Sequence, residues 1–382
     1  MKYYIIAGEA SGDLHGSRLI RALKANDPDA AFRIWGGDLM SKEGGTLVKH
    51  YSELAYMGFF EVLMNISTII RNIRFCKKDI LRYCPDAVIC IDYPGFNLPI
   101  ADYAKKHGLH TIYYISPQVW AWKESRVKKI KKMVDRMLVI LPFEKPFYQK
   151  WNYEVEYVGH PLLEVIDEFK KSHAGDAIKN AFSLKNKKIV ALLPGSRKQE
   201  INSTLPVMLE ATKQFKDIEC IIAQAPGVED DIIQQHTQSY KQIKVWKNNT
   251  YELLTIADAA MVASGTATLE TALFGVPEVV CFKTSWLSFF MARLFIKVKY
   301  ISLVNIIMNK QVIRELIQHQ LKASNIAEEL NQLLSNESTR NQMKKDFETL
   351  YQQLLPGGNA STNAAIKITN FLASKAIVSR TA

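Results

Sequence analysis

Two turns in the second half of this sequence carry residue types suited to holding a diphosphate. Each turn, at residues 192–197 and 264–270, follows an apolar run typical of a buried strand and begins a stretch typical of a helix. Small residues at a helix start leave backbone N–H groups free and place the positive end of the helix dipole there. Arg197 can add a bidentate contact to a phosphate, and Glu270 can accept hydrogen bonds from a ribose. The combination predicts a nucleotide-sugar ligand.

In the first half, Asp92 is the residue best suited to acid–base chemistry. It follows the apolar run 87–91, where a carboxylate is costly to bury unless it is used or hydrogen-bonded. Partial burial would raise its pKa towards the range of a general base. The alternative is that Asp92 caps the helix that follows, and the sequence leaves both interpretations open.

Two further turns contain candidate contacts for a ligand. The glycines of the turn at residues 8–13 allow close approach of the backbone to a ligand, but their spacing lacks the dinucleotide fingerprint. The alternative is a tight strand–helix turn capped by Ser11 or Asp13. The loop at 116–122 suits either an apolar rim for a lipid-like ligand or a hydrophobic plug. The candidate acceptor-site residues are Ser11, Gly12, Asp13, Gln118, Trp120 and Trp122.

Large apolar side chains and basic side chains occur together in two segments. Residues 57–64 precede a basic run within 71–78, and residues 286–297 mix aromatic and basic side chains. Apolar faces flanked by lysine and arginine suit a membrane interface, although core-facing helices with a solvated basic face give the same pattern. The membrane-facing candidates are Met57, Phe59, Phe60, Leu63, Trp286, Phe289 and Phe290.

The composition narrows the class of protein. With 382 residues, 48% of them hydrophobic and 23% charged, the chain has the size and composition of a two-domain globular protein. Its formal net charge of +11 favours nucleic acid, an anionic membrane or a phosphorylated substrate. No apolar stretch reaches the ~18 residues of a membrane-spanning helix, and the first residues do not resemble a signal peptide. Five cysteines without metal-type spacing and eight scattered histidines predict reduced thiols, a cytosolic protein and no metal.

Strand-like and helix-like runs alternate along the chain, which predicts an α/β protein with two doubly wound, Rossmann-like domains. We expect strands at 3–7, 32–35, 87–91, 111–115 and 136–140, and in the second half at 189–193, 218–223, 243–246, 259–263 and 278–282. We expect an N-terminal domain at 1–168, a C-terminal domain with the nucleotide-sugar turns at 169–355 and a tail helix within 356–382 that returns to the first domain. Ligands of such folds bind beyond the carboxyl ends of the strands.

Seven motifs in this order resemble one family, lipid-A-disaccharide synthase, over nearly the whole chain. The resemblance implies the glycosyltransferase-B architecture, in which two doubly wound domains face a cleft. It also implies that helices form the C-terminal part of the chain. The motifs are Gly8-Glu9-Ala10-Ser11-Gly12-Asp13, Ile91-Asp92-Tyr93-Pro94, Ser116-Pro117-Gln118-Val119-Trp120-Ala121-Trp122, Leu141-Pro142-Phe143-Glu144, Gly159-His160-Pro161, Leu193-Pro194-Gly195-Ser196-Arg197 and Ser264-Gly265-Thr266-Ala267-Thr268-Leu269-Glu270.

The resemblance implies a reaction and a place for it. The enzyme would transfer 2,3-diacylglucosamine from UDP-2,3-diacylglucosamine to the 6-hydroxyl of 2,3-diacylglucosamine 1-phosphate (lipid X). The products would be a β-1,6-linked lipid A disaccharide 1-phosphate, formed with inversion at the anomeric carbon, and UDP. Such a step of lipid A biosynthesis takes place in Gram-negative bacteria at the cytoplasmic face of the inner membrane. We therefore expect a peripheral membrane enzyme with lipid substrates, no nucleic-acid partner and no cofactor.

The resemblance also implies roles for single residues. Asp92 matches the family's candidate base, which takes the proton of the acceptor hydroxyl, and Arg197 matches the ligand of the diphosphate. Glu270 matches the ligand of the ribose. Tyr300 and Asn305 match a Tyr-x-Ser-Leu-Pro-Asn segment of the family, in which Val304 here replaces the common proline. The implied UDP-sugar-binding residues are Arg197, Ser264, Gly265, Thr266, Glu270, Tyr300 and Asn305.

Three other classes of protein share some of these features. A glycosyltransferase of the same architecture that acts on a lipid-linked peptidoglycan precursor would share the UDP half but differ around Asp92 and residues 120–122. A UDP-sugar 2-epimerase acts on a water-soluble substrate and needs no membrane-facing apolar runs. A basic nucleic-acid-binding protein would need a stripe of basic residues with stacking aromatics, and the sequence has no motif for reading DNA or RNA.

Overall fold

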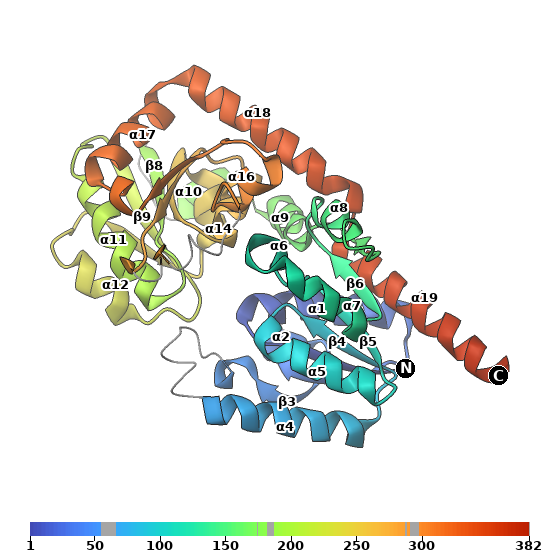
Figure 1. Cartoon of the computed structure of the whole chain (residues 1–382). Helices are drawn as coiled ribbons and strands as arrows, with labels where there is room; N and C mark the ends of the chain where they lie inside the picture. Colours follow the sequence, from blue (N-terminus) through green and yellow to red (C-terminus); the bar gives the residue numbers. More distant parts are fainter. Residues whose placement is uncertain (55–65, 174, 182–186, 287–288, 291–297, 382) are drawn as a thin grey trace. The chain divides into compact units, whose positions relative to one another are not determined.

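The computed structural model describes residues 1–54, 66–173, 175–181, 187–286, 289–290 and 298–381 (Figure 1). The chain forms two compact units, one of Met1–Pro161 with Leu355–Ala382 and one of Leu162–Leu354. The expected boundary at residue 168 falls inside helix α9 (Pro161–Ser172). This helix belongs with the second unit because Lys170 Nζ donates to the Leu273 carbonyl at 2.7 Å and the Tyr351 hydroxyl donates to Asp167 at 3.0 Å.

The first unit contains a seven-stranded parallel sheet in the order β3-β2-β1-β4-β5-β6-β7. Its five expected strands are confirmed, with ends shifted by at most one residue. Two edge strands were not predicted, since one is largely exposed and polar and the other has only 2 residues. The strands are β1 (Lys2–Ala7), β2 (Ala31–Gly36), β3 (Thr46–His50), β4 (Ala87–Ile91), β5 (His110–Tyr114), β6 (Arg136–Val139) and β7 (Glu156–Tyr157).

Helices cover both faces of this sheet (Figure 1). One face packs on α4 (Ile66–Tyr83), α5 (Pro94–Lys106) and α7 (Val127–Met133), and the other on α1 (Ala10–Asn26), α2 (Asp38–Lys42) and α19 (Ala360–Thr381). Alternate residues of each strand enter the two cores, so that Tyr4 and Ile6 lie in one and Tyr3 and Ile5 in the other. The tail helix α19 lies along α1. Two short helices, α6 (Val119–Trp122) and α8 (Glu144–Gln149), follow β5 and β6.

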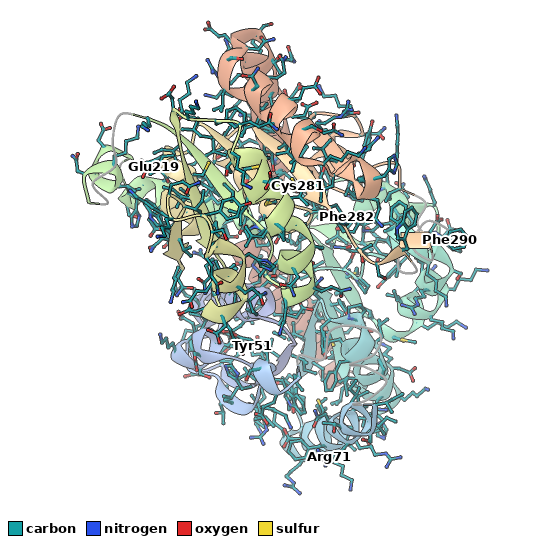
Figure 2. All side chains as sticks on the ribbon, turned by 90° about the vertical axis from the view of Figure 1, so that its left-hand side faces the viewer. Tyr51, Arg71, Glu219, Cys281, Phe282 and Phe290 are labelled. Carbon is teal, nitrogen blue, oxygen red and sulfur yellow. The ribbon has the colours of Figure 1, made fainter. Side chains whose placement is uncertain are left out.

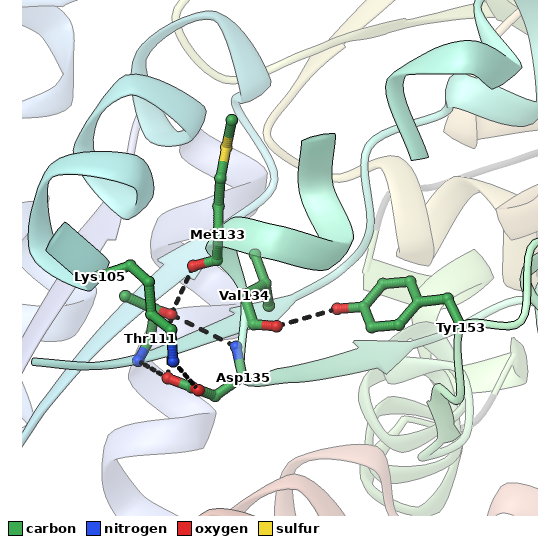
Figure 3. Close-up of polar contacts among 6 residues, drawn as sticks. All are labelled: Lys105, Thr111, Met133, Val134, Asp135 and Tyr153. Atoms are coloured by element: carbon green, nitrogen blue, oxygen red, sulfur yellow. Dashed lines mark hydrogen bonds and ion pairs between the residues drawn. The ribbon is translucent and has the colours of Figure 1, made fainter. Parts of the chain in front are cut away.

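A small polar cluster fixes the amino ends of β5 and β6 (Figure 3). The Asp135 carboxylate accepts from the Thr111 backbone N–H at 2.9 Å and pairs with Lys105. The Thr111 hydroxyl donates to the Met133 carbonyl at 2.6 Å, and the Tyr153 hydroxyl donates to the Val134 carbonyl at 3.3 Å. These bonds set the register of the two strands at the edge of the sheet opposite to their carboxyl ends.

The second unit contains a six-stranded parallel sheet in the order β10-β9-β8-β11-β12-β13. Of these strands only β13 was not predicted, because its four residues include an arginine and a glutamate. The strands are β8 (Lys188–Leu193), β9 (Ile218–Gln224), β10 (Lys244–Lys247), β11 (Ala259–Ala263), β12 (Glu278–Phe282) and β13 (Arg314–Ile317). Besides α9, the helices are α10 (Gly175–Ala181), α11 (Lys198–Thr212), α12 (Asp230–Thr237), α13 (Thr250–Ile256), α14 (Thr266–Leu273), α16 (Leu303–Met308), α17 (Ala323–Ser335) and α18 (Glu337–Leu354).

Because every strand pair in each sheet is parallel, the carboxyl ends of the strands in one unit lie at a single edge of its sheet. In the first unit this edge gathers the turns after β1, β4, β5 and β6. In the second it gathers the turns after β8, β11 and β12. Within each unit, the topology therefore brings together the residues for which the sequence predicts a chemical role.

One buried acid lies at the opposite edge of the second sheet. The side chain of Glu278, the first residue of β12, is 1% exposed, and neither carboxyl oxygen has a hydrogen-bond partner among the residues described. Burial raises the pKa of this carboxyl well above its ordinary value of 4.5. The folded protein therefore holds Glu278 neutral, and its contribution to stability is lost as the pH rises from about 4.5 towards the raised pKa.

We expect Glu278→Gln to remove this loss. The free energy of unfolding of the variant, measured in urea from pH 5 to 8, should rise relative to wild type by up to about 1.4 kcal/mol per pH unit. The matched control is Glu219→Gln on β9, where the carboxylate pairs with Lys244 (Glu219 is labelled in Figure 2). A difference between Glu278→Gln and wild type that stays constant with pH would contradict the interpretation.

Candidate functional site

The turn after β4 adopts an uncommon backbone conformation. Asp92 and Tyr93 both have left-handed backbones, with φ of 42° and 48°, which costs free energy for residues other than glycine. The buried side-chain amide of Asn97 stabilises this turn by donating to the carbonyls of Ile91 at 3.1 Å and Asp92 at 2.7 Å. The Tyr113 hydroxyl adds a bond of 2.6 Å to the Asp92 carbonyl. The strand end that carries Asp92 is therefore held in one conformation.

The glycines of the turn after β1 leave space that other atoms of the protein occupy. A Cβ at Gly8 would lie 2.2 Å from the Cδ1 atom of Tyr93, and a Cβ at Gly12 would lie 3.1 Å from the Ala7 Cβ. The predicted close approach of this backbone is thus made by the Tyr93 ring and by strand β1 itself. Gly8 is required so that the left-handed turn after β4 can pack against the turn after β1.

The Asp92 carboxyl is partly buried at the carboxyl edge of the sheet. Its pKa is raised to about 6, chiefly by burial and then by the nearby Glu9 carboxylate, while the Tyr93 backbone N–H opposes the rise. A carboxyl with this pKa is mostly ionised at pH 7 and is still basic enough to take a proton efficiently. These properties fit the predicted general base.

Asp13 has a positioning role in this structure. Its buried carboxylate accepts backbone N–H bonds from Gly37 at 2.7 Å, Leu39 at 3.1 Å and Met40 at 3.1 Å. These donors lie at the start of α2, so Asp13 caps that helix and not its own. Of its two neighbours in the predicted acceptor site, Ser11 is exposed and Gly12 is buried.

The loop after β5 is tied to the loop after β6 by a buried acid. Glu144 accepts from the Ser116 hydroxyl and from the Leu141 N–H at 2.9 Å, and burial raises its pKa to about 7. Trp120 packs its ring edge-on against Phe143 with centroids 4.9 Å apart and is buried, which is the plug that the sequence left as the alternative. Gln118 is exposed, and the side chain of Trp122 lies outside the part that the structure describes.

The turn after β8 presents Arg197 at the start of α11. No side chain caps the first turn of this helix, so its N–H groups remain available to an anion. The Arg197 side chain is 56% exposed and pairs with Glu200 at 3.2 Å. Gly195 has φ of 111°, and a Cβ there would lie 2.7 Å from a Glu200 oxygen. Glycine is thus needed at this position, because another residue would be strained at this φ and its Cβ would lie too close to Glu200.

The turn after β11 has the same character. Gly265 precedes α14 without a side-chain cap, and a Cβ there would meet nothing within 4 Å, so the space beside this backbone is open. Thr266 is exposed, whereas the Ser264 hydroxyl donates to the Ile301 carbonyl at 3.1 Å. Thus Gly265 and Thr266 present the turn to solvent, and Ser264 connects it to the segment that contains Tyr300.

Glu270 lies one turn into α14 and is held by a residue that the sequence analysis missed. The Tyr251 hydroxyl donates to the Glu270 carboxylate at 2.8 Å. Burial raises the pKa of Glu270 above its ordinary value, and the Tyr251 bond opposes the rise. An aromatic residue in a neighbouring helix gives no sequence signal for this contact, because nineteen residues separate the pair.

In this structure the Asn305 side chain is bonded to the protein itself, whereas the resemblance implied a contact with the UDP-sugar. Its amide nitrogen donates to the Ile313 carbonyl and to Glu315, both at 2.9 Å, and its oxygen accepts from the N–H groups of Val312 at 2.7 Å and Ile313 at 3.0 Å. These bonds use every donor and the usual acceptor capacity of the fully buried side chain. The alternative role as a structural residue of the turn fits these contacts, whereas Tyr300 is partly exposed beside it.

The membrane-facing candidates fall into three groups. Met57, Phe59, Phe60 and Leu63 lie outside the described residues. Trp286 and Phe290 are 75% and 60% exposed, and Phe289 is partly buried (Phe290 is labelled in Figure 2).

Helix α4 adds a surface of the same kind. Four apolar side chains on it are exposed, beside four exposed basic ones that include Arg71 (Figure 2). Its buried Asp79 is already bound by Arg33 at 2.7 Å, so no free acid on the helix offsets these cations. We call this set the α4 face: Ile66, Ile70, Phe75 and Leu81 with Arg71, Arg74, Lys78 and Arg82.

The described residues contain neither a metal-binding cluster nor a membrane-spanning helix. No group of three or more His, Cys, Asp or Glu side chains among them could hold a metal ion. Within the same ranges, no helix is long and apolar enough to cross a membrane.

The fold is that of the glycosyltransferase-B architecture. UDP-GlcNAc 2-epimerase from Neisseria meningitidis, solved with UDP-GlcNAc, matches 97% of this chain and 100% of its own with a TM-score of 0.68 at 12% identity. The glycotransferase of kitacinnamycin matches 97% and 98% with a TM-score of 0.63 at 14% identity. At such low identities these likenesses concern the fold alone.

Sequence comparison identifies the family. The family model of lipid-A-disaccharide synthetase matches residues 3–369. Lipid-A-disaccharide synthase of Syntrophus aciditrophicus is 40% identical over 95% of both chains, and that of Coxiella burnetii (strain CbuG_Q212) is 40% identical over 96% of this chain and 98% of its own. The chain belongs to the lipid-A-disaccharide synthase family and is thus a glycosyltransferase of lipid A biosynthesis.

The role of Asn97 in holding the Asp92 turn can be measured. We expect Asn97→Ala to lower the free energy of unfolding by about 2 kcal/mol, because it removes two buried hydrogen bonds and leaves the Asp92 carbonyl with the Tyr113 hydroxyl alone. The matched control is Asn26→Ala, since the Asn26 amide donates to one carbonyl at an exposed helix end. That control should stay within about 0.5 kcal/mol of wild type in urea unfolding. Equal losses for the two variants would show that the Asn97 bonds contribute little.

Proposed function

We propose that this chain transfers 2,3-diacylglucosamine from UDP-2,3-diacylglucosamine to the 6-hydroxyl of 2,3-diacylglucosamine 1-phosphate (lipid X). The observation that carries the proposal is the Asp92 carboxyl, fixed at a strand end with a pKa of about 6, in a member of the lipid-A-disaccharide synthase family. The products are the β-1,6-linked disaccharide 1-phosphate and UDP.

In the proposed reaction the Asp92 carboxylate takes the proton of the 6-hydroxyl as that oxygen attacks the anomeric carbon of the donor. The bond from this carbon to the diphosphate oxygen breaks on the opposite face, so the configuration inverts. The electron pair of that bond leaves with UDP. One base is sufficient for such a displacement, provided that the negative charge arising on the diphosphate is stabilised.

The second unit offers that stabilisation. Arg197 and the uncapped starts of α11 and α14 direct positive charge and free N–H groups at the carboxyl edge of its sheet. Glu270 would accept hydrogen bonds from the ribose hydroxyls of UDP. Support comes from neighbours with this fold that were solved with UDP-GlcNAc or UDP. No residue of this scheme requires a metal or another cofactor.

We further propose that the enzyme binds peripherally to the cytoplasmic face of the inner membrane, where both acylated substrates are found. The α4 face combines exposed apolar side chains with basic ones that make no ion pair with any residue the structure describes, which suits anionic lipid headgroups. Trp286 and Phe290 provide a second exposed apolar group, close in sequence to Lys283. An aromatic and basic surface of this kind has no use in an enzyme with water-soluble substrates.

We expect Asp92→Asn to abolish formation of the disaccharide while UDP binding persists, because the amide cannot accept the proton. Wild type, given both lipid substrates in the presence of EDTA, should form the disaccharide detected by mass spectrometry. Its kcat/KM should fall as the pH drops below about 6, since Asp92 then becomes protonated.

Arg197→Ala is the reciprocal control for this experiment and should weaken UDP binding. Turnover by Asp92→Asn close to the wild-type rate would exclude Asp92 as the base. Failure of wild type to form the disaccharide from this pair of substrates would exclude the proposed reaction.

We expect wild type to sediment with vesicles that contain about one-third anionic lipid, and to be released by salt because surface charges are screened. Arg74→Glu/Lys78→Glu, which reverses two charges of the α4 face, should reduce the bound fraction several-fold. Lys216→Glu/Lys241→Glu changes the net charge equally at exposed sites of the second unit and should bind like wild type. If both double variants lose the same fraction, net charge alone explains the binding and the α4 face has no special part.

A further inference from the structure

Strand β13 holds the segment that follows Tyr300, and this segment also accepts a hydrogen bond from Ser264 in the turn after β11. We propose that Glu315 is a positioning residue of the donor site, which fixes Tyr300 and Ser264 through the backbone of Ile301 and Ser302. The inference rests on the proposed use of a UDP-sugar. It concerns a residue that touches no substrate and acts through other parts of the chain.

The Glu315 carboxylate is bound by groups of the protein. One oxygen accepts from the Ser302 N–H at 3.0 Å, the Ser302 hydroxyl at 2.7 Å and the Asn305 amide at 2.9 Å. The other accepts from the Ile301 N–H at 3.1 Å. All four donors come from residues 301–305, so Glu315 holds this segment with both of its oxygens.

The same peptide segment reaches the turn after β11. The N–H of Ile301 is bound by Glu315, and the carbonyl of Ile301 accepts from the Ser264 hydroxyl at 3.1 Å. Any shift of Ile301 therefore moves the acceptor on which the Ser264 side chain is oriented. Gly265 and Thr266 come next in the chain, so loss of the Glu315 anchor should disturb the turn proposed to hold the diphosphate.

The opposite end of β13 supplies a matched control. The Gln318 side chain accepts from the Thr284 N–H at 2.8 Å and donates to the Thr284 carbonyl at 3.1 Å. Gln318 is buried, whereas Glu315 is partly buried, and Gln318 anchors the point where the chain leaves β12. Among the residues that the structure describes, it makes no hydrogen bond to Ile301, Ser302 or Ser264, so its loss tests stability without the proposed positioning effect.

The test measures the Kd for UDP by calorimetry at 25 °C, together with the unfolding temperature, for wild type and three single variants. Glu315→Ala should raise the Kd about tenfold, the size seen when other outer supporting contacts are lost. Glu315→Gln keeps one carbonyl oxygen that can accept the bonds from Ser302 and Asn305. It should therefore raise the Kd for UDP less than about threefold. Gln318→Ala should lower the unfolding temperature and leave the Kd unchanged.

A double variant tests the route through Ser264. Ser264→Ala removes the bond to Ile301. In this background, Glu315→Ala should raise the Kd for UDP by less than about twofold, well below its effect when introduced into wild type. Full additivity would overturn this route and with it the proposal.

Two further outcomes are decisive. If wild type binds UDP and neither Glu315 variant changes the Kd, or if Gln318→Ala raises it as much as Glu315→Ala, Glu315 is only structural and the proposal fails. If wild type does not bind UDP at all, the proposed function itself fails, and the inference that rests on it is overturned for that separate reason.

Discussion

The site in the first unit depends on one buried amide. The Asn97 side chain donates to two successive carbonyls at the end of β4 and so stabilises left-handed backbones at Asp92 and Tyr93. With this turn in place, the Tyr93 ring lies over Gly8, and the Asp92 carboxyl is held partly buried near Glu9. The raised pKa of Asp92 follows from that position, because burial and a like charge both disfavour the ionised form.

The second unit uses a carboxylate for the same purpose. Glu315 accepts bonds from the backbone and side chains of the segment that follows Tyr300, and Asn305 completes the cluster. In both units, then, a polar side chain that makes several hydrogen bonds, the buried Asn97 amide or the partly buried Glu315 carboxylate, holds a turn at the carboxyl edge of a parallel sheet. Arg197 and Thr266 are exposed at turns of this kind in the second unit, and Arg197 forms an ion pair with Glu200 there.

Burial of an acid does not by itself define a site here. Asp92, Glu144 and Glu270 are carboxyls with raised pKa values at the carboxyl edges of the sheets, and hydrogen bonds hold the last two. The pKa of Glu278 is raised further, but this residue lies at the opposite edge of its sheet. Its carboxyl group has no hydrogen-bond partner among the described residues. Position along the strand, and not the size of the pKa shift, separates the acids suited to chemistry from the one that only lowers stability.

Sequence patterns determined the alternation of strands and helices and ten strand positions, because buried parallel strands are continuous apolar runs. Residue types likewise determined the two small-residue turns and the carboxylate at the end of β4. Three short strands escaped prediction since they are exposed, polar or brief.

Only the tertiary structure decided which polar residues are free and which are used up by the protein. Asn305 and Asp13 proved to be bound by backbone groups, whereas Tyr251 donates to Glu270 and Glu315 accepts from Ser302. The reason is physical: a hydrogen bond depends on distance and direction in space, and the partners of these side chains are up to dozens of residues away along the chain.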